Sequence, residues 1–120
     1  MKIAFTTSGA DLDAQLDQRF GRAPKFLIYD LERATFEVVD NRQSMSASQG
    51  AGIQSAETVA RMGAEALVTG NCGPKAFRVL QAAGIKVFNS ESKTIAEALG
   101  KYRAGELSEA ASANAESHWV

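Results

Sequence analysis

The sequence predicts one α/β domain, in which a single mixed β-sheet carries helices on its faces. Three observations support this fold class. A short alternating segment opens the chain, two strand-like segments joined by three residues follow it, and the second half alternates between helical and strand patterns. With 120 residues, 45% of them apolar, the chain is long enough to bury a core as one domain.

The first half of the chain supplies three strands. Lys2 to Thr7 alternates in the manner of a strand, with Ile3 and Phe5 on one face and Ala4 on the other. The segments 25–31 and 35–40 also have strand composition, and the three residues between them are too few for anything but a hairpin.

The second half supplies helices and two further strands. An apolar stripe from Ile53 to Met62 predicts a helix, and the apolar run 66–69 predicts the next strand. Pro74 then opens a helix that stops at Gly84, a residue typical of a helix C-terminus.

A last strand at 86–89 precedes a third helix. Thr94-Ile-Ala-Glu97 is a capping box, which marks the start of a helix with Ile95, Leu99 and Tyr102 on one face. Residues 107–120 are rich in Ala, Ser and Glu, and we expect them to be disordered. The sequence thus predicts a domain over residues 1–105 and a flexible tail over 106–120.

Composition excludes several classes of protein. A net charge of −1 gives no reason to expect a nucleic-acid or membrane partner, and no apolar run approaches the ~20 residues that span a bilayer. The only cysteine, Cys72, excludes an internal disulfide and a metal centre built from cysteines alone. The only histidine is His118. We expect a cytoplasmic protein.

The turn after the strand at 66–69 is the first candidate binding site. It reads Gly70-Asn71-Cys72-Gly73, and Lys75 follows in the first turn of the next helix. Free N–H groups and the dipole of a helix N-terminus attract anions. The spacing is not that of a Walker A loop.

The loop after the first strand is the second candidate. Ser8 and Gly9 follow that strand directly, and ligands of α/β sheets bind where strands end and helices begin. We expect this loop to face the turn at 70–75 across a crevice.

Three side chains near these loops have both a functional and a structural interpretation. Cys72 could ligate Cu(I), with its thiolate favoured by the helix N-terminus, or could merely be a small residue in a tight turn. Arg22 is a candidate for pairing with an anion. Arg19 is a weaker candidate, because an aspartate of the same loop could pair with it. Met45, in the long loop 41–52, could form a soft lid over the site or simply pack.

Four short motifs, in this order, carry a resemblance to a known family. They are Phe20-Gly21-Arg22-Ala23-Pro24 before an extended segment ending in Asp30, Gly50-Ala51-Gly52 opening a helix, Thr69-Gly70 with Gly73-Pro74, and Ala83-Gly84-Ile85. Over residues 1–105 the chain resembles the small nitrogenase iron–molybdenum cofactor biosynthesis domain family. The resemblance implies a ribonuclease H-like fold of three layers, with strand order 3-2-1-4-5 and strand two antiparallel.

The resemblance also implies a function. Members of this family accumulate, carry or insert preassembled metal–sulfur clusters, and the stand-alone bacterial type that this chain most resembles carries a molybdenum–copper sulfide cluster. Because residues 1–105 contain no histidine, an iron–molybdenum cofactor held by direct ligation fits less well. An anionic molybdenum–copper sulfide cluster could be held by N–H groups and cations alone. We expect a monomeric carrier, served by cluster donor and acceptor proteins.

Two other functions can be compared with this one. A metal-dependent nuclease needs converging carboxylates, but the strands at 2–7 and 66–69 end in Thr7 and Thr69. No nucleophile–base pair is visible either, so we expect no catalysis. A phosphate- or nucleotide-binding module remains an alternative, since N–H groups that accept sulfide also accept phosphate.

Overall fold

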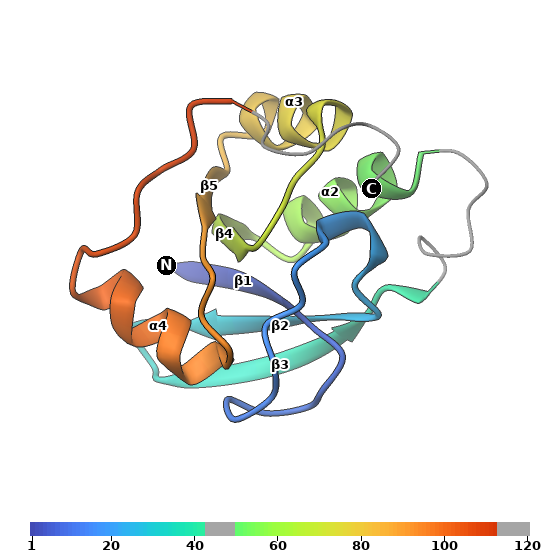
Figure 1. Ribbon diagram of the computed structural model, residues 1–120. Coiled ribbons are helices and arrows are strands. Elements are labelled where there is room, and N and C mark those ends of the chain that lie inside the picture. The colour runs from blue at the N-terminus through green and yellow to red at the C-terminus, as the bar shows by residue number, and fades with distance from the viewer. Residues whose placement is uncertain (43–49, 113–120) are drawn as a thin grey trace.

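The computed structural model describes residues 1–42 and 50–112. In these ranges a five-stranded sheet has the order β3-β2-β1-β4-β5 (Figure 1). Its strands are β1 (Lys2–Thr7), β2 (Lys25–Asp30), β3 (Thr35–Asp40), β4 (Ala64–Thr69) and β5 (Lys86–Asn89). Only β2 is antiparallel to both of its neighbours, while β1, β4 and β5 pair in parallel. The strand order and the reversed strand two are confirmed.

Helices cover both faces of the sheet. They are α2 (Ala51–Arg61), α3 (Pro74–Ala82) and α4 (Ile95–Arg103), with a short 3-10 helix η1 (Phe20–Arg22) before β2. α2 and α3 pack on one face and α4 on the other (Figure 1). In β1, Ala4 enters the core beneath α2 and α3, whereas Ile3 and Phe5 enter the core beneath α4. The predicted alternation of β1 is therefore confirmed, and the fold has three layers.

Several helix and strand ends lie close to their predicted positions. The Thr94 hydroxyl accepts a hydrogen bond from the Glu97 N–H at 3.2 Å, as the capping box predicts. Gly84 ends α3 in the left-handed region, with φ of 76°. β4 begins two residues before the predicted start because the exposed Glu65 interrupts the apolar run and hides the strand's beginning.

The segment after α4 differs from the disorder expected from residue 107. The Ala110 N–H donates to the Val87 carbonyl at 2.7 Å, and Glu109 forms an antiparallel bridge with Phe88. Leu107 packs against the core beneath α4. Residues 107–110 therefore lie along the outer side of β5, held by two small patches of apolar contact that composition alone concealed.

Among the helices of the described ranges, none has the length and apolar character needed to cross a membrane.

Candidate functional site

The carboxyl ends of β1 and β4 are joined inside the molecule. The Thr6 hydroxyl lies 2.9 Å from the Thr69 hydroxyl and 2.7 Å from the Asp17 carbonyl. Thr6 and Thr69 are both fully buried. These contacts tie the loop that follows β1 to the ends of both central strands.

Residues 15–18 cross the edge where the crevice was expected. The Thr7 hydroxyl donates to the Gln15 carbonyl at 2.8 Å, and the Asn71 side-chain amide donates to the Gln18 carbonyl at 2.9 Å. The segment 8–14 instead turns toward the start of α4, where the Ala96 N–H donates to the Leu12 carbonyl. Ser8 and Gly9 are therefore separated from the turn at 70–75 by residues 15–18.

The β4–α3 turn is held tightly by this crossing segment. A Cβ atom on Gly70 would lie 2.7 Å from the Gln18 Cα, so only glycine fits there without a shift of the backbone. The Gly70 carbonyl accepts a hydrogen bond from the Asn89 side chain at 3.1 Å. In these contacts the predicted site residues Gly70 and Asn71 act as positioning residues.

Two helices begin at this same edge with glycine at the N-cap. Gly50 precedes α2 and Gly73 precedes α3, and neither described helix start has a side-chain cap. The first N–H groups bonded within each helix are those of Gln54, to Gly50, and Phe77, to Gly73. The N–H groups of both first turns therefore have no partner within their own helix.

The 3-10 helix η1 lies between these two helix starts. On one side, the buried Asn41 amide donates to the Ala23 carbonyl at 2.8 Å and to the Ser55 hydroxyl of α2 at 3.0 Å. On the other side, the Phe20 N–H donates to the Asn71 carbonyl at 3.1 Å. The starts of α2 and α3 are drawn at the right of Figure 1, on the same side as η1.

Two cationic side chains accompany the helix starts. Arg22, in η1, is half-buried, and Lys75, in the first turn of α3, is exposed. Together with the positive ends of two helix dipoles they make this edge favourable for an anion. The predicted Arg22, Gly73 and Lys75 thus belong to one region of the structure.

Cys72 does not have the environment that the sequence suggested. Its side chain is fully buried, in the same core cluster beneath α2 and α3 as Phe20 and Phe77. Burial raises the pKa of the Cys72 thiol to about 12. The expectation of a favoured thiolate is wrong, because burial of the side chain disfavours its charged form.

The remaining predictions divide between the described residues and the rest. Arg19 is exposed, and its backbone N–H, not its guanidinium, donates to the Asp17 carboxylate at 3.0 Å. Met45 lies outside the described residues. Within 1–42 and 50–112, no three His, Cys, Asp or Glu residues are grouped so that they could hold a metal ion.

Sequence reasoning missed the part played by the start of α2. Gly50, Ala51 and Gly52 were predicted both as the end of the long loop 41–52 and, from the family motif, as the opening of a helix; the structure confirms the helix, with Gly50 as its N-cap. Asn41 and Ser55, which fix that helix start against η1, were not singled out at all. The available signal was the pair of glycine-led helix starts, one before Ala51 and one before Pro74.

The sequence and the fold can be compared with those of known proteins. The sequence matches the dinitrogenase iron-molybdenum cofactor family over residues 1–105. The chain belongs to this family, and the resemblance noted from its motifs is confirmed.

Three individual proteins are similar to this chain in sequence, and two of them have solved structures with the same fold. The chain is similar to the orange protein from Desulfovibrio gigas, whose apo structure has 44% sequence identity and a TM-score of 0.92 over 95% of this chain and 96% of that one. A NifB-type protein of the DUF35 family from Thermotoga has 35% identity and a TM-score of 0.83, over 96% and 97% of the two chains. An uncharacterised protein from Methanocaldococcus jannaschii is 32% identical over 110 residues, 89% of each chain. These relationships indicate a cofactor-binding or carrier role rather than a catalytic one.

Proposed function

We propose that the protein carries a preassembled, anionic cluster of molybdenum, copper and sulfide. The cluster sits at the carboxyl edge of the sheet, between the N-termini of α2 and α3 and beside η1. The observation that carries the proposal is the meeting of two glycine-capped helix starts with Arg22 and Lys75. Membership of a cofactor family and similarity to the orange protein support it.

The proposed binding uses hydrogen bonds and charge in place of protein–metal bonds. Sulfide ligands of a cluster accept hydrogen bonds from backbone N–H groups and from cationic side chains. An anion loses water on entering, and fixed N–H dipoles replace part of that hydration. Direct ligation fits the described residues poorly, since the Cys72 thiol is buried in the core and stays protonated at neutral pH. An iron–molybdenum cluster that needs protein ligands is for the same reason the less suitable cargo.

The proposed role is that of a non-enzymatic, monomeric, cytoplasmic carrier. It receives its cluster from a donor protein and passes it to an acceptor. A cluster held without covalent bonds to the protein can leave without ligand exchange at a metal, which suits transfer.

The test is reconstitution of the apo protein with tetrathiomolybdate and copper, followed by gel filtration and absorption spectroscopy. Lys75→Glu reverses an exposed charge at the proposed site, and Arg61→Glu reverses one at the far end of α2. We expect Lys75→Glu to weaken cluster retention at least about tenfold, the usual scale for one charge-assisted contact. Arg61→Glu should retain the cluster as the unaltered protein does.

Backbone amide shifts locate the cargo independently of charge. We expect the largest shifts on cluster addition at 20–22, 50–53 and 73–76. Cys72→Ala should retain the cluster with an unchanged spectrum, and loss of colour in that variant would return Cys72 to the ligand set. Equal retention by the Lys75 and Arg61 variants, or shifts confined to other regions, would overturn the proposal. Inorganic phosphate that shifts the same amides while tetrathiomolybdate and copper do not would favour the anion-binding alternative.

A further inference from the structure

Of the two edge strands of the sheet, β5 is covered by another described segment and β3 is not. At β5, the outer edge is bonded to residues 109–110, through the Ala110 N–H and the Val87 carbonyl. At β3, no described residue pairs with the outer side. An uncovered edge strand presents N–H and C=O groups to which another strand can bond. The edge formed by β3 is therefore available within the described part of the chain.

Hydrogen bonding to β2 identifies which groups of β3 face outward. The Asn41 N–H donates to the Pro24 carbonyl at 2.7 Å, in continuation of the β2–β3 ladder. Because inward and outward groups alternate along an antiparallel strand, the odd-numbered residues of β3 bond to β2. The backbone groups of Phe36, Val38 and Asp40 thus face outward.

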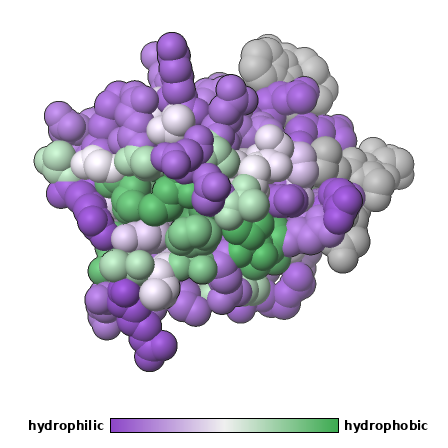
Figure 2. All heavy atoms as spheres, turned by 90° about the horizontal axis from the view of Figure 1, so that it is seen from below, coloured by the Kyte–Doolittle hydropathy of each residue, from purple (hydrophilic) through white to green (hydrophobic). Residues whose placement is uncertain are grey.

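One side of this edge is apolar. Phe36 is 40% exposed, and Val38 is half-buried on the same side of the sheet. Leu12 and Leu31 are half-buried and pack against the same core beneath α4. Seen from below, apolar residues gather near the middle of the molecule, with more polar residues between and around them (Figure 2).

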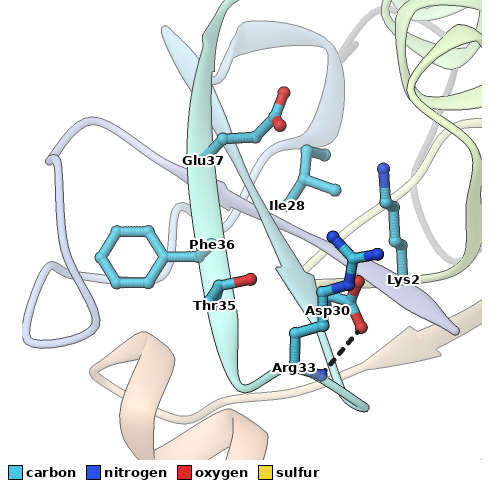
Figure 3. A pocket seen from close by; sticks show the side chains of 7 residues that line it. All are labelled: Lys2, Ile28, Asp30, Arg33, Thr35, Phe36 and Glu37. Carbon is cyan, nitrogen blue, oxygen red and sulfur yellow. Dashed lines mark hydrogen bonds between the residues drawn. The ribbon is translucent and has the colours of Figure 1, made fainter.

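The other side of the edge is charged. A cavity of about 290 Å³ lies there, and its charged lining residues are Lys2, Asp30, Arg33 and Glu37. In Figure 3, Glu37, Arg33 and Lys2 lie on the side of Ile28, whereas Phe36 points the opposite way. A strand added at β3 would place alternate side chains on the apolar patch and in this charged cavity.

We propose that the outer edge of β3 binds an extended segment of a partner protein by strand addition. The pattern of the edge specifies the segment: apolar residues opposite Phe36 and Val38, a cation opposite Glu37, and a carboxylate opposite Thr35, on the side of Arg33. Strand addition takes its affinity from the backbone and its specificity from alternate side chains. The inference concerns the apo protein and does not depend on the proposed cargo.

A second copy of this chain fits the edge less well than such a partner. The antiparallel register that sets Phe36 against Val38 of the other copy also sets Glu37 directly against Glu37. Like charges directly opposite each other on paired strands are unfavourable. A charge in the middle of an edge strand is also a common guard against self-pairing.

The test uses two synthetic peptides with blocked ends and the apo protein labelled for NMR. The first peptide, Thr-Val-Lys-Val-Asp-Val-Thr, matches the edge. The second replaces its Lys with Asp. We expect the first to shift the amides of Phe36, Val38 and Asp40 and to bind at least about tenfold more tightly than the second, the scale of one charge-assisted pair.

Three variants make the test specific. Val38→Pro removes an outward N–H while leaving the bonds to β2, and should weaken binding of the first peptide at least about tenfold. Glu37→Lys should reverse the preference between the peptides, whereas the matched change Glu57→Lys on exposed α2 surface should not. If the Val38→Pro variant does not fold, the reversed peptide preference expected of Glu37→Lys still tests the proposal.

Three results would overturn the inference. They are the absence of shifts along β3, an unchanged peptide preference in Glu37→Lys, and concentration-dependent shifts of β3 without peptide, which would make a second copy the occupant. Cluster retention is measured on separate samples, so failure here leaves the proposed function standing.

Discussion

The hydroxyl groups of Thr6 and Thr69 lie 2.9 Å apart with no exposure to solvent, although 62 residues separate them in the sequence. Thr6 is also 2.7 Å from the Asp17 carbonyl. One buried hydroxyl thereby joins the two central strands to the loop that crosses their ends. Together with the Asp17 N–H, which donates to the Thr6 carbonyl at 2.7 Å, this contact holds that loop against β1.

Replacement of Thr6 by Val should therefore destabilise the protein. The change keeps the side-chain volume but leaves the Thr69 hydroxyl without this partner in a dry interior. We expect a loss of about 1–3 kcal/mol in the free energy of unfolding, measured by urea denaturation. Amide exchange at residues 17–19 should accelerate more than exchange in α4. An unchanged unfolding midpoint would show that water or another group replaces the hydroxyl.

Two glycines provide a matched pair of substitutions to alanine. At Gly70 the new Cβ would press on the Gln18 backbone, so Gly70→Ala should cost about 1–3 kcal/mol. At Gly100, inside α4, nothing lies within 4 Å of the added Cβ, and Gly100→Ala should stabilise the protein by about 0.5–1 kcal/mol. Thermal unfolding of both variants measures the contrast. Similar effects from the two would mean that the Gln18 segment yields easily.

Asn41 joins η1 to α2, and its replacement should lower the free energy of unfolding. Asn41→Ala leaves the Ala23 carbonyl and the Ser55 hydroxyl without a buried donor, so we expect a loss of about 1–3 kcal/mol. Arg42→Ala, which removes only an exposed pair with Asp40, should change stability by less than about 0.5 kcal/mol. Chemical denaturation compares them. If the two changes cost the same, the buried Asn41 contacts do not hold the helix start.

The buried thiol of Cys72 should make stability fall in alkaline solution. The thiol has a pKa of about 12 in the folded chain, whereas a thiol in an unfolded chain has a pKa of about 8.5. The unfolded state thus binds fewer protons in this window, and unfolding becomes easier as the pH rises. The contribution is about 1.4 kcal/mol for each pH unit above about 8.5.

Denaturation of the unaltered protein and of Cys72→Ala between pH 8 and 10.5 isolates this contribution. The stability difference between them should shrink steadily as the pH rises. Iodoacetamide should also react with Cys72 far more slowly in the folded chain than in urea. Parallel pH profiles for the two proteins would contradict the buried position of the thiol.

The fold could be predicted from the sequence because its signals are local. The alternation of Ile3 and Phe5, the short hairpin link and the Thr94 capping box each report on a few adjacent residues. Strand order came from the family resemblance, since nothing local in the chain states that β1 lies between β2 and β4. The attachment of Ala110 to β5 was missed because it depends on a contact between distant residues.

The candidate site was predicted only in part, for a related reason. Motif reasoning found Arg22, Gly73 and Lys75, which do lie around the helix starts. It failed at Cys72, where position near a helix N-terminus suggested a thiolate, because sequence does not tell which way a side chain points. It also paired the loop of Ser8 with the turn at Gly70, since the course of residues 15–18 between them is set by tertiary hydrogen bonds.

The attachment of residues 109–110 to β5 also has a consequence for the order of events during synthesis. A ribosome releases β5 about twenty residues before Ala110 follows it. Through that interval the nascent sheet has open edges on both flanks, at β3 and at β5. Association with other chains is easiest while an edge strand is unprotected. The stretch from Leu107 to Ala110 would thus cover this edge last, and until it binds to β5 the chain is more prone to associate with other chains.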